Sequence, residues 1–168
     1  MTGNFSPRTT QLLDTADAAC ARRGARLTDL RREVLGLILD SVAPTGAYEL
    51  LDKLRTRRGV AGPPTVYRAL EFLREQGLVH RIERLSAFVG CIDAPDHVAH
   101  DHAGHSHGAH RHAAQFLICR SCRRVTEIED RSLSHALAQA ARQVGFTVAS
   151  ATIEAEGQCT ACTAAATA

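Results

Sequence analysis

The chain has 168 residues, of which 45% are hydrophobic and 23% charged, with a formal net charge of +2 at pH 7. It contains no apolar run of about 18 residues, so we expect no membrane-spanning helix. Residues 1–8 lack the apolar stretch of a secretory signal peptide. We therefore expect a cytoplasmic protein, in which thiols stay reduced and paired cysteines favour metal over disulfide.

Positive charge gathers in the N-terminal half. Residues 1–84 hold 14 Lys/Arg and 10 Asp/Glu, whereas residues 85–168 hold 6 and 8. Lys53 is the only lysine, so the excess is arginine, whose planar guanidinium suits phosphates and guanine edges. The excess is modest and by itself is weak evidence for nucleic-acid binding.

The first half predicts four helices and then two short strands. Ser6 and Thr28 are caps for the first two helices, and Gly24 ends the first. The third helix covers about 47–58, and the fourth runs from Pro63-Pro64 to Gly77, each with apolar residues at helical period. Strands are expected at 78–84 and 87–92. Helices followed by a two-stranded wing are typical of a winged helix, a helix-turn-helix variant.

The fourth helix is a candidate DNA-reading helix. Thr65, Tyr67 and Arg68 lie in its first turns, where residues of a recognition helix reach base edges. An arginine there can bind guanine O6 and N7 in bidentate fashion. The pattern equally fits a plain amphipathic helix whose polar face is solvated, so both interpretations stay open on this evidence.

Residues 93–112 contain seven histidines and read as a low-complexity loop between domains. We expect a DNA-binding domain at 1–84, with its wing extending to about 92, and a second domain at 113–168. In the second domain, strands are expected at 115–119, 124–129 and 146–155. A helix capped by Asp130 or Ser132 lies between the last two, and 163–168 is expected to be frayed. The fold class is therefore α+β, and a domain of this size usually needs a metal or an oligomer partner.

Two Cys-x-x-Cys pairs form the strongest chemical motif. Cys119/Cys122 and Cys159/Cys162 are separated by 36 residues, enough for a strand–helix–strand unit. Four thiolates form a closed tetrahedral zinc site with no open position for chemistry, so we predict structural zinc.

Other donors are less decisive. His80, Cys91, His112 and Glu127 offer a mixed nitrogen, sulfur and oxygen set that suits zinc, but their spacing alone does not show that they act together. No Gly-rich phosphate loop, His-Glu-x-x-His motif or nucleophile–base pair is present. We therefore expect no enzyme.

The chain resembles the Fur superfamily of bacterial metalloregulators, and most closely its zinc uptake regulator branch, over about residues 8–162. The Thr-Val-Tyr-Arg-Ala-Leu core at 65–70 is shared across the superfamily, and the double proline before it and Cys91 point to the zinc branch. Further matching segments are 26–28, 31–35, 47–51, 71–73, 75–80, 116–122, 153–155 and 157–162.

The resemblance implies a homodimeric, zinc-responsive transcriptional repressor of zinc-uptake genes, with a C-terminal α/β dimerisation domain and two zinc ions per protomer. It implies structural zinc at the four paired cysteines and sensory zinc at His80, Cys91, His112 and Glu127. Tyr48 and Arg68 fall where family members touch bases of operator DNA. Asp52 and Arg55 fall where two dimers can join on one operator.

The long His-rich insert departs from the family pattern, and it leaves His110 or His97 as substitutes for His112. Alternatives that remain are a nickel or iron sensor of the same superfamily, and a His-rich zinc-buffering protein. Cys91 disfavours iron, and residues 113–116 lack the His-Asp-His run of iron and peroxide sensors.

Overall fold

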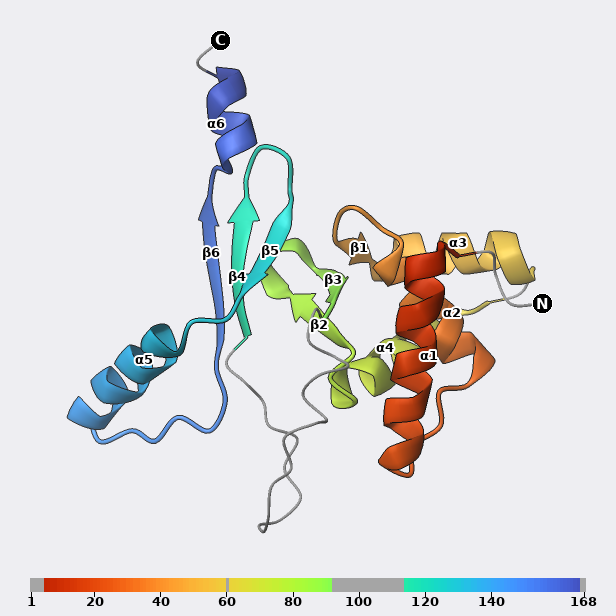
Figure 1. Cartoon of the computed structure of the whole chain (residues 1–168), viewed down its shortest axis with the longest axis horizontal. Coiled ribbons are helices and arrows are strands. Elements are labelled where there is room, and N and C mark those ends of the chain that lie inside the picture. The colour runs from red at the N-terminus through yellow and green to blue at the C-terminus, as the bar shows by residue number, and fades with distance from the viewer. Residues whose placement is uncertain (1–4, 60, 92–113, 167–168) are drawn as a thin grey trace. The chain divides into compact units, whose positions relative to one another are not determined.

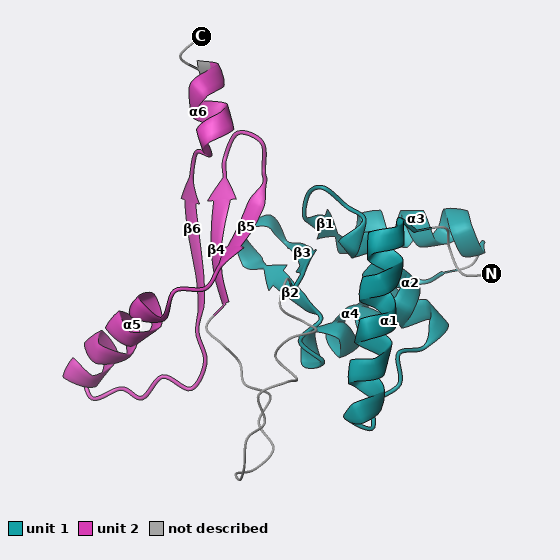
Figure 2. Cartoon of the chain, in the orientation of Figure 1, with its two compact units in different colours: residues 1–107 teal, residues 108–168 magenta. Residues whose placement is uncertain are grey.

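The computed structural model describes residues 5–59, 61–91 and 114–166, and the chain divides into two compact units, 1–107 and 108–168 (Figure 2). The division falls outside the described ranges, as does the expected linker at 93–112. The expected domain limits at 84 and 112 therefore stay predictions.

The described part of unit 1 contains the four expected helices (Figure 1): α1 Pro7–Arg22, α2 Asp29–Leu39, α3 Ala47–Arg58 and α4 Pro63–Glu75. The Ser6 side chain caps α1 by accepting a hydrogen bond of 3.2 Å from the amide of Thr9. Thr28 stands at the cap position of α2, but within the described chain its side chain makes no capping hydrogen bond.

A single apolar cluster joins these helices. Each helix contributes the apolar face that the helical spacing of its hydrophobic residues predicted. The cluster includes Leu13, Cys20, Val34, Ile38, Leu50, Leu54, Val66, Leu70 and Leu73. Burial of this inner face leaves Tyr67 and Arg68 on the outer side of α4. The core therefore fixes which side chains α4 presents to a partner.

The wing is a small antiparallel sheet with the order β1-β3-β2 within the described residues. Its strands are β1 Thr45–Gly46, β2 Val79–Ile82 and β3 Ala87–Gly90. The expected strand at 78–84 ends at Ile82 because Glu83–Leu85 forms a short 3-10 helix, which Ser86 ends at φ 48°. Strand β1 was not expected, since two residues show no alternation.

Unit 2 has a three-stranded sheet with the order β5-β4-β6 in its described part. The strands are β4 Ala114–Cys119, β5 Val125–Ile128 and β6 Thr152–Gly157, and β4 pairs antiparallel to β5 and parallel to β6. Helix α5 Arg131–Gln143 starts at Asp130, whose side chain accepts a 2.8 Å bond from the Ser132 amide.

Two expectations for unit 2 were wrong. The strand expected at 146–155 begins only at Thr152, because its pairing with β4 starts where Ala114 faces Thr152. Residues 163–166, expected to be frayed, belong to helix α6 Thr160–Ala166. Its alanines favour helix, and the Thr163 amide donates to the Cys159 carbonyl at 2.9 Å.

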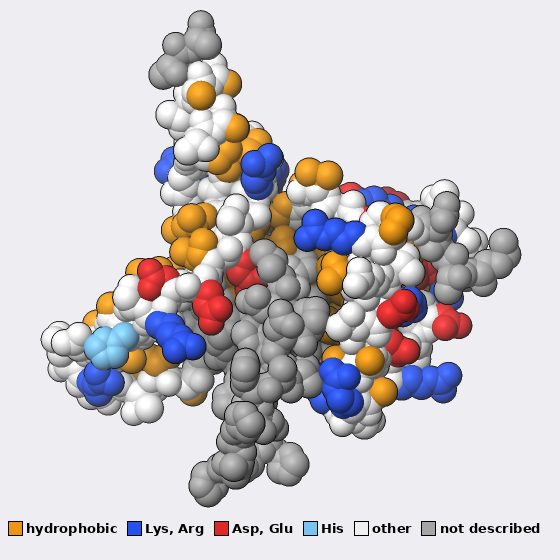
Figure 3. Space-filling view, in the orientation of Figure 1, with side chains coloured by type: hydrophobic (Ala, Val, Ile, Leu, Met, Phe, Trp, Pro, Cys, Tyr) orange, Lys and Arg blue, Asp and Glu red, His pale blue; other side chains and the backbone are white. Residues whose placement is uncertain are grey.

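Helix α5 leaves an apolar surface exposed in the single chain. No residue of α5 is buried against the described part of the chain. Hydrophobic side chains lie on the surface of the α5 lobe in Figure 3; Leu133 is 40% exposed, and Phe146 beyond the helix is 64% exposed. No described helix is long and apolar enough to cross a membrane.

Candidate metal centre and nucleic-acid interface

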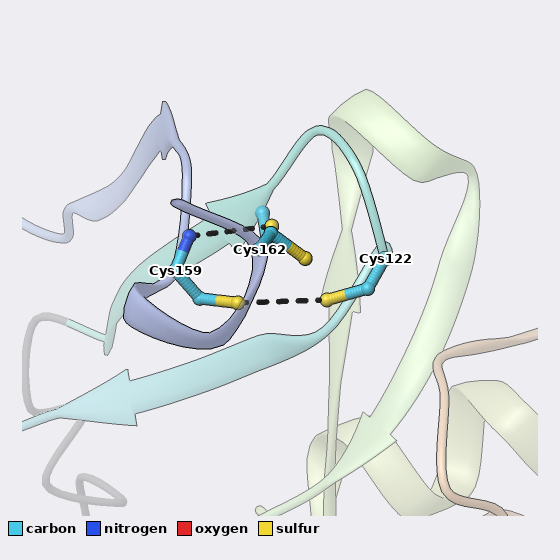
Figure 4. A group of neighbouring side chains, drawn as sticks. Cys122, Cys159 and Cys162 are labelled. Carbon is cyan, nitrogen blue, oxygen red and sulfur yellow. Dashed lines mark hydrogen bonds between the residues drawn. The ribbon is translucent and has the colours of Figure 1, made fainter. Parts of the chain in front are cut away.

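The sheet of unit 2 brings the two cysteine pairs together. Cys119 ends β4, and the parallel register places it opposite Gly157, just before Cys159. Cys122 lies in the turn after β4, and Cys162 lies on α6. The four sulfurs all lie within 4.8 Å of one another, and Figure 4 shows Cys122, Cys159 and Cys162 pointing toward one another.

The sulfur separation fits a tetrahedral metal site. Zinc–sulfur bonds of about 2.3 Å in a tetrahedron place two sulfurs about 3.8 Å apart. The Sγ atoms of Cys122 and Cys159 lie 3.8 Å apart. The donor set is soft, closed and correctly spaced, so the four cysteines could hold a metal ion and fit zinc.

The backbone prepares one of these thiols for ionisation. Amides of Cys122 and Cys159 donate to the sulfur of Cys119 and lower its pKa to about 6; the Cys159 bond measures 3.4 Å. Hydrogen bonds with the thiols of Cys159 and Cys122 raise the pKa of Cys162 to about 12. Without a cation, four neighbouring thiolates would repel one another, so full ionisation of the set needs a bound metal.

Two of the mixed donors lie together in unit 1. His80 is on β2 and pairs with Val89, while the Cys91 amide closes the end of the wing by donating to the Leu78 carbonyl at 3.1 Å. A ring nitrogen of His80 and the sulfur of Cys91 lie within 4.8 Å. Cys91 is buried and His80 half-buried. This pair can therefore supply two ligands to one ion.

The other two mixed donors are Glu127, in unit 2, and His112. Glu127 is on β5, where it faces Phe116 of β4. His112 lies outside the described residues, as do His97 and His110. The grouping of these residues with His80 and Cys91 therefore stays a prediction.

The candidate DNA-contacting side chains lie on α3 and α4. Tyr48 is 71% and Tyr67 49% exposed, although both are large and aromatic. Thr65 is half-buried and Arg68 is exposed. Arg68 forms no hydrogen bond or ion pair with the described residues. Its charge is therefore available to a partner.

Asp52 and Arg55 pair with each other along α3. Their side chains are 3.7 Å apart and are 77% and 50% exposed. The Arg55 Nε also donates to the Ala61 carbonyl at 3.1 Å. In the single chain this is an ordinary surface pair on one helix, and a contact between dimers stays a prediction.

Sequence reasoning did not single out Arg31, which borders a hollow between α2 and α4 together with Arg68. Its only signals in the sequence were its place one turn after the Thr28 cap and its position in the family-matching segment 31–35. The first signal is common in helices and carries no specificity without the packing.

Comparisons with known proteins agree on the family. The Ferric uptake regulator family matches residues 22–156. The chain is 39% identical to the Zinc uptake regulation protein of Escherichia coli (strain K12) over 156 residues, which cover 92% of this chain and 82% of that protein. It is 31% identical to the Zinc uptake regulation protein of Mycobacterium tuberculosis (strain H37Rv) over 142 residues, covering 83% and 95%.

Solved structures give the same picture. The crystal structure of holo XcZur superposes with a TM-score of 0.76 at 40% identity, covering 92% of this chain and 98% of the other. A zinc uptake regulator complexed with zinc and DNA superposes with a TM-score of 0.80 at 36% identity, covering 95% and 98%.

Proposed function

Since the chain belongs to the ferric uptake regulator family, we propose that it is a zinc-responsive transcriptional regulator. In this proposal it binds operator DNA when loaded with zinc and represses genes of zinc uptake. The observation that carries the proposal is the combination of a four-sulfur metal site in unit 2 with an exposed arginine and tyrosines on the helices of unit 1. Similar proteins carry the name zinc uptake regulation protein.

We assign structural zinc to Cys119, Cys122, Cys159 and Cys162. The sulfur spacing and the closed donor set support this assignment. The cysteines lie where β4 ends and where α6 begins after β6, so a bound metal would cross-link these two segments at one end of the sheet. Metal binding there contributes directly to folding, because the unfolded chain has no preformed site.

Sensory zinc is assigned to His80, Cys91, His112 and Glu127. The closeness of His80 and Cys91 in unit 1 supports the first half of the set. The other two ligands belong to the second part of the chain, so an ion shared by all four would restrain the two units. A restrained dimer can hold two recognition helices at the separation of two half-sites. By reciprocity, DNA binding must then tighten zinc binding.

DNA contacts are assigned to Tyr48, Thr65, Tyr67 and Arg68. The exposure of both tyrosines supports the assignment, since tyrosine is enriched at binding interfaces. Within the described chain the guanidinium of Arg68 has no partner, so it is available to bind a base edge.

A homodimer is proposed with the apolar face of α5 as part of its interface. Leu133 and Leu137 are 40% and 39% exposed in the single chain, and a second copy of unit 2 would cover them. Each protomer would carry two zinc ions, and Asp52 and Arg55 would link two dimers on one operator.

Operator binding tests the proposal. A duplex selected from a random library by the zinc-loaded protein is titrated by fluorescence anisotropy at buffered free zinc. Affinity should rise as free zinc rises, and nickel or iron at matched free concentration should give a weaker response. Zinc binding without zinc-dependent DNA affinity would instead favour the zinc-buffering function that the seven histidines in residues 93–112 suggest.

A further inference from the structure

Two arginines border one hollow in unit 1. The hollow has a volume of about 230 Å³ and lies between the first turns of α2 and α4; its lining residues are Thr28, Leu30, Arg31, Thr65, Arg68 and Ala69. Within the described residues, neither Arg31 nor Arg68 has a carboxylate partner. The hollow is therefore bordered by two positive charges that the described chain leaves uncompensated.

Arg31 is held in place without being neutralised. Its Nη1 donates to the Arg26 carbonyl at 2.7 Å, and its guanidinium carbon lies 3.6 Å from the centre of the Phe72 ring. These contacts orient the planar group and leave its other N–H groups available. An arginine ordered before binding loses less conformational freedom when it binds an anion.

Hydroxyl groups complete the set of donors. Pro63 and Pro64 occupy the first positions of α4 and have no N–H, so the start of α4 offers fewer amides to an anion than other helices do. Thr65 follows them and lines the hollow. Across it, the Thr28 hydroxyl is not used in capping α2 within the described chain. The acidic Asp29 is in the first turn of α2 but does not line the hollow.

We infer that this hollow binds a backbone phosphate of duplex DNA, with Arg31 as its principal ligand. The inference rests on the proposed function and adds a residue to it. The fixed guanidinium can donate two parallel bonds to phosphate oxygens, and the hydroxyls of Thr28 and Thr65 can donate to the same group. Arg68, exposed at the border of the hollow, remains free for a base edge. A phosphate fixed by Arg31 sets the register in which Arg68 reads sequence.

Salt dependence separates a phosphate contact from a base contact. Arg31→Gln is compared with wild type on the library-selected duplex and on its scrambled version, over a series of salt concentrations at saturating zinc. The slope of log affinity against log salt should become shallower by about one per bound protomer. Affinity should fall by the same factor on both duplexes.

The matched control is Arg32→Gln. Arg32 is the next residue on α2, but its charge is paired with Asp14 at 2.5 Å. It should therefore keep the wild-type slope. Thr28→Val serves as a second variant if Arg31→Gln unfolds. It should weaken binding to both duplexes and leave the salt slope unchanged, because the hydroxyl carries no charge and its loss changes no counterion release.

The outcomes are distinguishable. A wild-type slope in a folded Arg31→Gln, or a loss confined to the selected duplex, overturns the phosphate site while the proposed function stands. Thr28→Val with wild-type affinity also counts against it. Wild-type protein that binds neither duplex at any zinc level overturns both proposals.

Discussion

Arg68 is the residue on which sequence reading should depend most. It lies on the outer side of α4, opposite the buried face formed by Val66 and Leu70. If its guanidinium contacts a base edge, Arg68→Ala should cost about 1–3 kcal/mol of specific binding, concentrated at one operator position. Binding to single-base variants of the selected duplex measures this.

Arg74→Ala is the matched control for Arg68, because Arg74 is basic and exposed in the last turn of the same helix. Arg74→Ala should lower operator affinity much less, and its effect should not concentrate at one operator position. An equal loss on every sequence after Arg68→Ala would show that Arg68 contacts phosphate and does not read a base.

Asp40 ties the end of α2 to the start of α1. Its carboxylate accepts hydrogen bonds from the hydroxyls of Thr9 at 2.6 Å and Ser6 at 2.9 Å, and these bonds lower its pKa. The folded pKa is therefore below the unfolded value of about 3.9. The stabilisation is present above that unfolded value and is lost as pH falls through the folded one.

Asp40→Asn should accordingly lower the free energy of unfolding at neutral pH. The carboxylate is exposed, so we expect at most about 1 kcal/mol. Urea unfolding of both proteins at neutral pH and at about pH 3 should show the difference shrinking in acid. A difference that is constant with pH would contradict the role of the ionised carboxylate.

At the scale of the elements, two of the ion pairs in the described chain lie within α3 and allow a matched comparison. Asp52 pairs with Arg55 at 3.7 Å, and Glu49 pairs with Lys53 at 2.7 Å. If Asp52 also links dimers, Asp52→Arg should reduce cooperativity on a duplex with two dimer sites and spare binding to a single site. Glu49→Arg is the control, since it should lower the stability of α3 to a similar extent, by a few tenths of a kcal/mol. Mobility-shift titrations that resolve one and two bound dimers measure this.

Equal cooperativity in wild type and Asp52→Arg would show that the pair acts only within its helix. Loss of cooperativity in Glu49→Arg as well would assign the effect to α3 as a whole and not to Asp52.

The elements best predicted from sequence are those with local signals. The start of α1 follows from Ser6-Pro7, and the bounds of α3 follow from the helical period of its apolar residues, because these effects involve residues a few positions apart. The start of β6 depends on where β4 offers a partner, which sequence periodicity does not encode. The hollow beside Arg31 also depends on packing between two helices, and no local pattern marks it.

The candidate metal site was predictable for the same reason. Each Cys-x-x-Cys pair is a local motif, and the strand–helix–strand between the pairs returns the chain to the same end of the sheet. The mixed donors were harder, because His80 and Cys91 approach only through the pairing of β2 with β3. Their relation to Glu127 and His112 was inferred from the family resemblance.

At the scale of the whole molecule, we expect the folding of unit 2 to depend on zinc at the four cysteines. Its described part buries few large side chains, chiefly Phe116 and Ile118, and leaves α5 uncovered. Structural zinc sites contribute about 10–16 kcal/mol in zinc-finger peptides, comparable with the entire stability of a small domain, about 5–15 kcal/mol.

Cys119→Ser should therefore unfold unit 2 and abolish dimerisation, because serine is a poor zinc donor. Zinc content by elemental analysis and mass by light scattering check this. A folded dimer with its full zinc content would show that the four-cysteine site is dispensable for folding.

In the proposed mechanism, a second zinc site, separate from the structural one, controls DNA binding. Cys91 is the sharpest probe, since it lies at the end of the wing and outside the four-cysteine cluster. The most direct measurement is operator affinity of wild type and Cys91→Ser across buffered free zinc, with zinc content determined on the same samples. Cys91→Ser should remain a folded dimer with one zinc per protomer, and should bind the operator weakly at every zinc level. Wild-type zinc response in Cys91→Ser, or unfolding like that expected of Cys119→Ser, would contradict the claim.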